Sequence, residues 1–242
     1  MPLDLAHFVT LDRFDAMDRV GAEVSHFLLS VGDARYDAWR FDTHAQFVDD
    51  ASGVGGYVTV PAARVESRNR IGDVDVGLLY MPELAPRTLS AVLHAGLGLP
   101  TSASATGGPI QEGIVSRIAD TALSIPAGST ARLGGSLIWR DDQLFARGDA
   151  ALDANLDAAG GRVDPIVRGG AGVGLIAGSA ALMAEAEVLG GGPLASVGGT
   201  GSLSVRLDAG PLQVYGAYVF GLDSHTRQTM SEAFILGTDV PL

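Results

Sequence analysis

Apolar and polar side chains alternate along many stretches of this chain. In residues 39–47 the odd positions carry mostly Trp, Phe and Ala, whereas the even positions carry Arg, Asp, His and Gln. Residues 144–156 repeat the pattern, with Leu, Ala and Gly set against Arg, Asp and Asn. A period of two is typical of a β-strand with two different faces. The stretch 144–156 is longer than an ordinary half-buried strand, but its length suits a strand that crosses a membrane at a tilt.

The same alternation continues through the chain and predicts about 12 strands. They span residues 19–28, 37–48, 54–61, 72–81, 88–100, 130–140, 143–157, 166–177, 180–189, 196–207, 211–221 and 232–242. An even number of strands is usual for single-chain bacterial barrels. We therefore expect an all-β fold, a transmembrane up-and-down antiparallel β-barrel.

The connections between these strands alternate in length. Short connections follow every second strand, at residues 49–53, 82–87, 141–142, 178–179 and 208–210. Mostly longer ones fall between them, including residues 61–71, 101–129, 158–165 and 222–231. Membrane barrels have short periplasmic turns and longer outer loops in this order. A soluble all-β domain, the main alternative, has no reason to sort its connections in this way.

The pattern divides the chain into a short N-terminal segment and a barrel. We expect residues 1–18 to be an N-terminal periplasmic segment and residues 19–242 the outer-membrane β-barrel, with a long outer loop at 101–129. The sequence leaves open whether residues 1–18 plug the lumen, extend into the periplasm or lack structure. It also leaves open whether loop 101–129, which carries apolar residues of its own, plugs or constricts the barrel.

Two sequence signals that are common in membrane and exported proteins are missing from the sequence. The chain contains no run of about 18 apolar residues that would form a transmembrane helix. The first 30 residues show no signal peptide, although a barrel needs an export signal, so we expect the sequence to begin at a processed or cut terminus.

Residues 179–189, SAALMAEAEVL, are the most ambiguous segment. They consist of good helix formers, so a helix is the alternative there. Ala, Leu and Val alternate with Met and Glu along the segment, which favours a strand.

Composition adds to this prediction. The mean hydropathy is +0.25 with only 18% charged residues, which is unusually apolar for a soluble protein. The formal net charge of −12 argues against a nucleic-acid partner, because no basic stripe is present to neutralise phosphates. The absence of Cys fits passage through an oxidising periplasm.

The polar face of the predicted strands would line the lumen. Its predicted members are Arg40, Asp42, His44, Asp73, Asp75, His94, Arg132, Arg147, Asp149, Asp153, Glu185, Glu187 and Arg206. One interpretation is an aqueous channel whose acidic excess favours cations or polar neutral solutes. The other is that opposite charges pair across a narrow lumen and only fill it.

Aromatic side chains near predicted strand ends could form the girdles that mark the two membrane interfaces. The candidates are Trp39, Tyr80, Trp139, Tyr218 and Phe220. Such residues also cap the cores of soluble proteins.

Catalysis and cofactors find little support in the sequence. A barrel lipase needs a Ser and a His on the lipid-facing side, but His44 and His94 belong to the polar set, and His26 has no expected partner. The His residues are not spaced as metal ligands, and the Gly-rich residues 169–178 lack a phosphate-binding motif. Those glycines are expected to be small residues in a closely packed strand. We therefore expect no enzyme, no metal and no cofactor.

Two motifs carry a resemblance to a known family. The segments IGDVDVGLLY, residues 71–80, and LHAGLGLPTSAS, residues 93–104, resemble the transporter-type barrels of bacterial outer membranes that are named after the meta-pathway of phenol degradation. The last strand, AFILGTDVPL, also resembles a C-terminal barrel-insertion signal, although it ends in Leu242 where an aromatic residue is usual.

The resemblance and the charged inner face together lead to an expected function. We expect a bacterial outer-membrane protein, in contact with outer-membrane lipid, that acts as a passive or weakly selective channel or transporter for small polar or aromatic solutes. The alternatives are a plugged structural barrel whose outer loops bind a partner, and a soluble β-barrel or sandwich that binds an apolar ligand.

Overall fold

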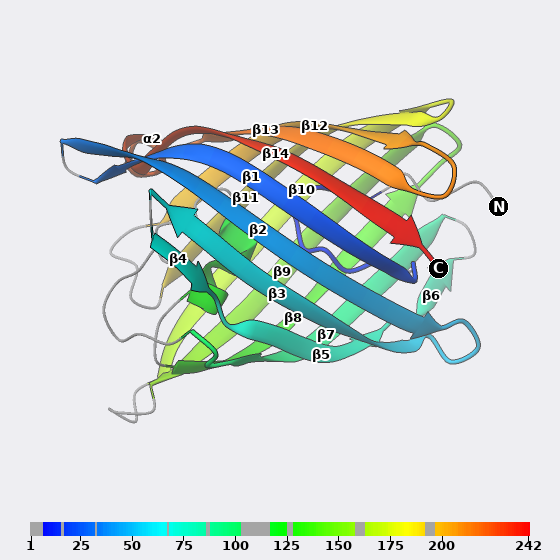
Figure 1. Cartoon of the computed structure of the whole chain (residues 1–242). Helices are drawn as coiled ribbons and strands as arrows, with labels where there is room; N and C mark the ends of the chain where they lie inside the picture. The colour runs from blue at the N-terminus through cyan, green and yellow to red at the C-terminus, as the bar shows by residue number, and fades with distance from the viewer. Residues whose placement is uncertain are drawn as a thin grey trace.

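Twelve long antiparallel strands close into a barrel in the computed structural model of the chain (Figure 1). The structure describes residues 7–15, 17–31, 33–66, 68–85, 88–102, 117–124, 128–157, 163–191 and 197–242. The barrel strands are β1 (Arg19–Val31), β2 (Ala34–Asp49), β3 (Val54–Val65), β5 (Val74–Tyr80), β7 (Leu89–Leu99), β8 (Gly128–Arg140), β9 (Leu144–Asp157), β10 (Val163–Ala177), β11 (Ala180–Gly191), β12 (Gly198–Asp208), β13 (Gln213–Gly221) and β14 (Met230–Pro241).

Four short elements accompany the barrel strands. They are β4 (Arg68–Ile71), which pairs with β3, β6 (Glu83–Ala85), which pairs with β7, the 3₁₀ helix η2 (Ile118–Ser124) and the helix α2 (Ser224–Thr229). None of these was expected from the alternation pattern.

Every barrel strand pairs with the next barrel strand along the chain, and the first pairs with the last. The seam joins β1 to β14, with Arg19 opposite Pro241, and β2 pairs with β3 to complete the ring. The predicted fold class is therefore confirmed, and the soluble-sandwich alternative is wrong because the sheet closes on itself.

The two ends of the barrel differ. At the end that we call the turn end, the strands are joined by residues 50–53, 81–88, 141–143, 178–179 and 209–212. The other end, the loop end, carries α2 and the β3–β4 turn, and the strands joined there include β7 with β8. Gly53 and Gly178 take positive φ angles of 66° and 64° in the tight turns, a conformation that favours glycine.

The outside of the barrel is apolar and the inside is polar. On β8, Leu133 and Leu137 are 61% and 55% exposed, whereas Arg132 and Ser136, which alternate with them, are buried. The other barrel strands show similar alternation, as expected when one face meets lipid. Within the described residues, no helix is long and apolar enough to cross a membrane.

The predicted strands agree with the observed ones to within a few residues. Residues 180–191 form strand β11, as the alternation predicted, so the helix alternative there is wrong. Backbone pairing with β10 on one side and β12 on the other outweighs the helix propensity of this segment.

Candidate functional site: the barrel interior

The predicted lumen-lining residues lie on the inner side of the barrel. Twelve of them are buried, and the side chain of the thirteenth, Asp149, is only 7% exposed. They are Arg40, Asp42, His44, Asp73, Asp75, His94, Arg132, Arg147, Asp149, Asp153, Glu185, Glu187 and Arg206. Their lining of a path for solutes remains a prediction.

Many of these charges form ion pairs with one another. Arg132 lies 2.6 Å from Asp75 and 3.2 Å from Asp153, and Arg147 lies 2.7 Å from Asp149. Buried charges need such partners, because desolvating an unpaired charge costs several kcal/mol, on the order of 3–5 kcal/mol when one partner is removed. The pairing interpretation therefore describes the interior of this structure.

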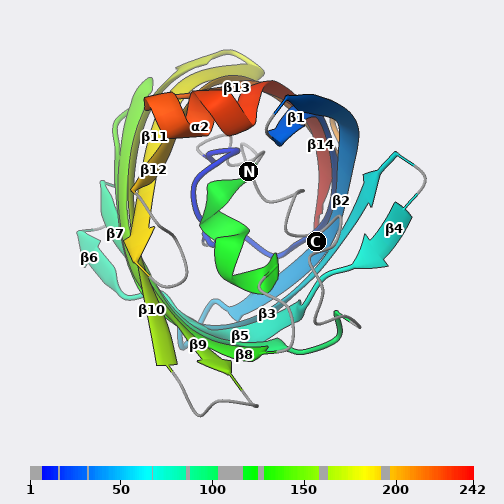
Figure 2. The same ribbon diagram turned by 90° about the vertical axis from the view of Figure 1, so that its left-hand side faces the viewer.

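A segment of the chain itself occupies the lumen. Residues 7–15, which we call the plug segment, are all buried, and Figure 2 shows them in blue inside the ring of strands, beside the green helix η2. The predicted periplasmic location of residues 1–18 thus gives way, for the described residues 7–15, to a place within the barrel.

Glu185 of β11 anchors the centre of the plug segment. Its carboxylate accepts hydrogen bonds from the backbone N–H groups of Val9, Thr10 and Leu11, at 3.2, 2.6 and 3.2 Å. It also accepts from the hydroxyl groups of Thr10 and Ser204, at 2.9 and 2.7 Å. These bonds satisfy buried backbone N–H groups that have no strand partner. One carboxylate thus accepts the hydrogen bonds that the carbonyl groups of a neighbouring strand would otherwise accept.

Arg117 holds the same stretch from the opposite side. Its guanidinium donates to the carbonyl of Val9 and, at 2.8 Å, to the carbonyl of Leu11. Because Arg117 directly precedes η2, the plug segment and this part of the predicted loop 101–129 are bound to each other within the lumen. Residues 103–116 and 125–127 of that loop lie outside the described residues.

Helix η2 is fixed to the wall by charge. Asp120 pairs with Arg40 of β2 at 2.7 Å, and Arg132 of β8 donates to the carbonyl of Ala119 at 2.9 Å. Burial alone would raise the pKa of Asp120, but the surrounding guanidinium groups, Arg40 first among them, hold the pKa of that carboxyl well below its usual range.

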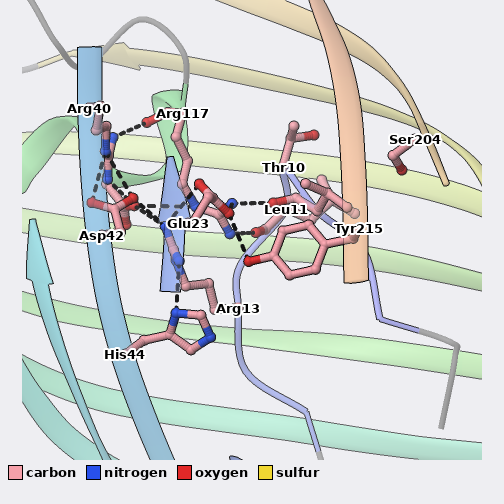
Figure 3. A network of polar contacts seen from close by, with 12 residues as sticks. Thr10, Leu11, Arg13, Glu23, Arg40, Asp42, His44, Arg117, Ser204 and Tyr215 are labelled. Atoms are coloured by element: carbon pink, nitrogen blue, oxygen red, sulfur yellow. Dashed lines mark hydrogen bonds and ion pairs between the residues drawn. The ribbon is translucent and has the colours of Figure 1, made fainter. Parts of the chain in front are cut away.

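The C-terminal half of the plug segment meets an ionic cluster on β1 and β2 (Figure 3). Arg13 donates to Asp42 at 2.5 Å, lies 3.4 Å from Glu23 and contacts Nδ1 of His44 at 3.1 Å. Figure 3 shows these side chains converging on the guanidinium from neighbouring strands. Arg13 therefore supplies a positive charge to Asp42 and Glu23, two carboxylates that are buried inside the barrel.

Asp12 points to the opposite wall. It pairs at 2.9 Å with Arg168 of β10, which also donates to Asp153 at 2.8 Å. Burial alone would raise the pKa of Asp12, but the Arg168 guanidinium outweighs it and holds the pKa well below its usual value. The plug segment thus carries two carboxylates, Asp12 and Asp15, and one guanidinium, Arg13. Each has an opposite charge on the wall, since Asp15 lies 3.2 Å from Arg19 of β1.

Glycines of β10 make room for the apolar side chains of the plug segment. A Cβ atom at Gly172 would lie 2.4 Å from a ring carbon of Phe8, and one at Gly170 would lie 2.6 Å from Leu11. Phe8 also packs against Phe145 of β9, with 5.1 Å between ring centroids. The expected close packing is therefore observed at Gly170 and Gly172, where the neighbour is the plug segment, and at Gly174, where it is Phe145. Nothing lies within 4 Å of a Cβ atom at Gly178.

Phe14 packs against strands β3 and β7 inside the barrel. Its ring lies 4.2 Å from that of Tyr57 and 4.6 Å from that of His94, centroid to centroid. The carbonyl of Phe14 accepts a hydrogen bond from Arg147 at 2.9 Å. Aromatic stacking and one charged donor thus hold this end of the plug segment.

The sequence prediction missed several interior residues. Arg168 and Asp239 stand at inward positions of β10 and β14, where the alternation could have identified them. Arg13, Asp12, Arg117 and Asp120 lie outside the predicted strands, so no periodicity marks them.

On the outside of the barrel, the predicted interface aromatics fall near both ends. Tyr80 and Trp139 stand near the turn end, and Trp39, Tyr218 and Phe220 stand nearer the loop end. All are exposed except Phe220, which is half-buried. Their contact with membrane interfaces remains a prediction.

His26, which had no expected partner, faces outward and has one in the structure. Its Nε2 lies 2.5 Å from Asp37, and its ring packs 4.5 Å from that of Trp39. No group of His, Asp and Glu suited to hold a metal ion occurs among the described residues.

Comparisons with known proteins bear on the fold. No known protein family and no curated sequence matches the chain. Among solved structures, it is similar to an outer-membrane channel from Pseudomonas putida F1, with a TM-score of 0.66 and 9% identity over 100% of this chain and 99% of that one. It is also similar to the KdgM porin, with a TM-score of 0.57 and 10% identity over 92% and 99% of the chains.

A third similar structure is LpxR from Salmonella typhimurium, with a TM-score of 0.53 and 11% identity over 92% of this chain and 99% of that one. The chain therefore has the fold of bacterial outer-membrane β-barrels. The resemblance to the meta-pathway transporter family remains a prediction.

Proposed function

We propose that this protein is a bacterial outer-membrane channel that is closed at rest by the plug segment. The apolar outside of the barrel supports a place in lipid, because large exposed Leu, Val and Phe side chains surround it. The same surface argues against the soluble-barrel alternative. The loop end would then face outward and the turn end the periplasm.

The observation that carries the proposal is how the plug segment is held. Side chains bind residues 7–15, through Glu185, Arg117, Arg147 and Arg168, and the segment forms no strand of the barrel. Such contacts can be broken without opening the backbone ladder of the wall. A closed barrel with a removable plug is the arrangement of a gated channel.

The solute class follows from the interior charge. Within the described residues, buried carboxylates outnumber buried guanidinium groups. We infer small polar solutes, neutral or cationic, because an acidic lumen repels anions. The KdgM porin has been solved with disordered oligogalacturonate, and the acidic interior of the present chain favours a different charge class.

A disulfide lock tests the gate. Gly170 on β10 faces Leu11 of the plug segment, and the chain has no cysteine, so Leu11→Cys with Gly170→Cys introduces the sole pair. In planar bilayers the reduced variant should show openings, and the oxidised one should stay closed. A variant lacking residues 1–17 should conduct steadily.

A deletion variant that inserts but never conducts would sink the channel proposal and leave the barrel intact. It would favour the second candidate, a plugged structural barrel whose outer loops bind a partner, which the filled interior also suits. The absence of enzymatic activity remains a prediction.

A further inference from the structure

The outer surface of β2, β3 and β4 contains a hollow of about 520 Å³. It lies where the β3–β4 hairpin leaves the ring of strands, which Figure 2 shows clearly at β4. The separation begins at Pro61, which has no N–H to continue the ladder; past Thr59, strand β3 pairs with β4 and no longer with β5. The volume is in the range of small-molecule and lipid-chain sites.

Two rows of side chains line this hollow. Strand register places Phe41, Ala62 and Ile71 opposite one another across β2, β3 and β4, and these form the apolar row. The small side chain of Ala62 between two larger ones creates the depth of the hollow. An alkyl chain fits such a surface, because burying it removes apolar area on both partners from water.

The second row is polar and lies closer to the loop end. Trp39, Arg64 and Asn69 stand opposite one another across the same strands, and Arg64 and Asn69 line the hollow. Arg64 is exposed, and its Nε donates to the carbonyl of Glu66 at 2.8 Å. With the loop end at a membrane interface, as proposed above, its guanidinium would lie near the lipid headgroups.

Arg64 supplies a positive charge to the lining of the hollow. Among the side chains that the structure describes in residues 64–70, RVESRNR, Arg64 is the only arginine that lines the hollow. Trp39, opposite Arg64, donates to the carboxylate of Asp37, so one exposed acid also lies close by. A guanidinium beside an apolar hollow at a membrane interface matches a ligand with an anionic head and an alkyl tail.

We propose that this hollow binds an anionic amphiphile, with its carboxylate or phosphate head on Arg64 and Asn69 and its alkyl chain over Ala62 between Phe41 and Ile71. The ligand is a resident anionic lipid, because the hollow lies on the apolar outer surface of the barrel. A free long-chain acid, which shares this chemistry, is the alternative outcome of the test. The site lies outside the lumen and is independent of the gate, although it rests on the membrane location proposed above.

Trp39 provides the probe, because it neighbours Arg64 and the chain has only one other tryptophan. In a Trp139→Phe background, Trp39 fluorescence is measured in vesicles that contain dibrominated phosphatidylglycerol, dibrominated phosphatidylcholine or dibromostearate. We expect at least a threefold larger quenching constant for a brominated anionic amphiphile than for brominated phosphatidylcholine. Preference for the glyceride assigns the site to membrane lipid, and preference for the free acid assigns it to a solute.

Matched variants locate the effect. Arg64→Gln and Ala62→Leu should abolish the preference, the first by removing the charge and the second by filling the hollow. Arg227→Gln should leave it unchanged, because Arg227 is also an exposed loop-end arginine whose Nε donates to a carbonyl, that of Asp223. In a Trp39→Phe background, Trp139 near the turn end should show no preference.

Equal quenching of Trp39 by anionic and zwitterionic lipid would overturn the site, as would equal losses in Arg64→Gln and Arg227→Gln. Gel migration with and without boiling shows separately whether each variant forms a closed barrel in the vesicles. A chain that does not insert overturns the membrane location, whereas an inserted chain without preference overturns only this site.

Discussion

The two sides of the plug segment contact the barrel wall by different means. Toward β1 and β2, Arg13 lies among Asp42, Glu23 and His44, and the contact is ionic. Toward β10, Phe8 and Leu11 fill space that glycines leave free, beside a single ion pair between Asp12 and Arg168. Ionic contacts are costly to break singly and respond to pH, whereas packing contacts depend on shape alone. The gate therefore has one side that is mainly ionic and one side where packing predominates.

The largest effect is expected on the ionic side. Arg13→Gln leaves Asp42 and Glu23 without the counter-charge of the plug segment, which costs about 3–5 kcal/mol for a broken buried pair. A single cysteine introduced as Val9→Cys should then react with a thiol reagent about two to three orders of magnitude faster, since about 1.4 kcal/mol corresponds to a factor of ten.

Arg13→Lys, which keeps the charge, should lie between the parent and Arg13→Gln in this labelling. If the Arg13→Gln rate equals that of the parent, the ionic side does not hold the plug segment.

Asp120 of η2, which lies 3.8 Å from Arg13, should show the pH dependence of the ionic side. The pKa of Asp120 is lowered in the folded protein. Its contribution to the stability of the folded state is therefore fully present above its unfolded pKa of about 3.9, and it is lost as the pH falls through the lower folded pKa. The ratio of the labelling rates of Asp120→Asn and the parent at position 9 should correspond to about 3 kcal/mol at neutral pH. This free-energy difference should stay constant from pH 8 to pH 5. Below about pH 4 it should shrink. A difference that already shrinks near pH 6 would contradict the assigned pKa direction.

The packing side should respond less strongly. Gly172→Leu places a side chain where Phe8 lies, and overpacking of this kind costs about 1–3 kcal/mol. Labelling at position 9 should accelerate at every pH and salt concentration alike. Gly148→Leu is the matched control, because nothing lies within 4 Å of a Cβ atom there. Equal effects of the two substitutions would show that β10 provides no specific space.

Thr10→Ala should give the smallest effect. It removes the hydroxyl bonds of Thr10 to Glu185 and Ser202 but leaves the three backbone donors in place, a loss of about 1–2 kcal/mol. Thr10→Ser should restore most of the parent labelling rate. A loss as large as that of Arg13→Gln would mean that the Glu185 anchor, and not the ionic side, dominates.

The barrel wall was predictable because lipid imposes alternation on every strand. Leu133 and Leu137 must face lipid, so Arg132 must face inward, and each strand carries this information in its own sequence. The interior pairs were less predictable, since the alternation shows that Arg147 faces inward but not that Asp149 and Phe14 receive it.

The plug segment was not predictable for a related reason. Residues 7–15 have no period, and their conformation is fixed by long-range contacts such as the one between Thr10 and Glu185. The β3–β4 hairpin left one signal, Pro61, which interrupts a strand that otherwise alternates.

The seam of the barrel has a consequence for how the chain assembles. Arg19 at the start of β1 donates to the carbonyl of Arg13 in the plug segment and lies 3.5 Å from Asp239 of β14. One guanidinium therefore contacts the plug segment and the last strand at the point where the ring closes. Pairing of the first and last strands closes the longest loop of the chain and should be the slowest step.

A segment tied to that seam is most easily packed while the sheet is still open. The plug segment would then serve as a template around which the strands curl, and the time at which it becomes protected from labelling during refolding would precede the time of ring closure.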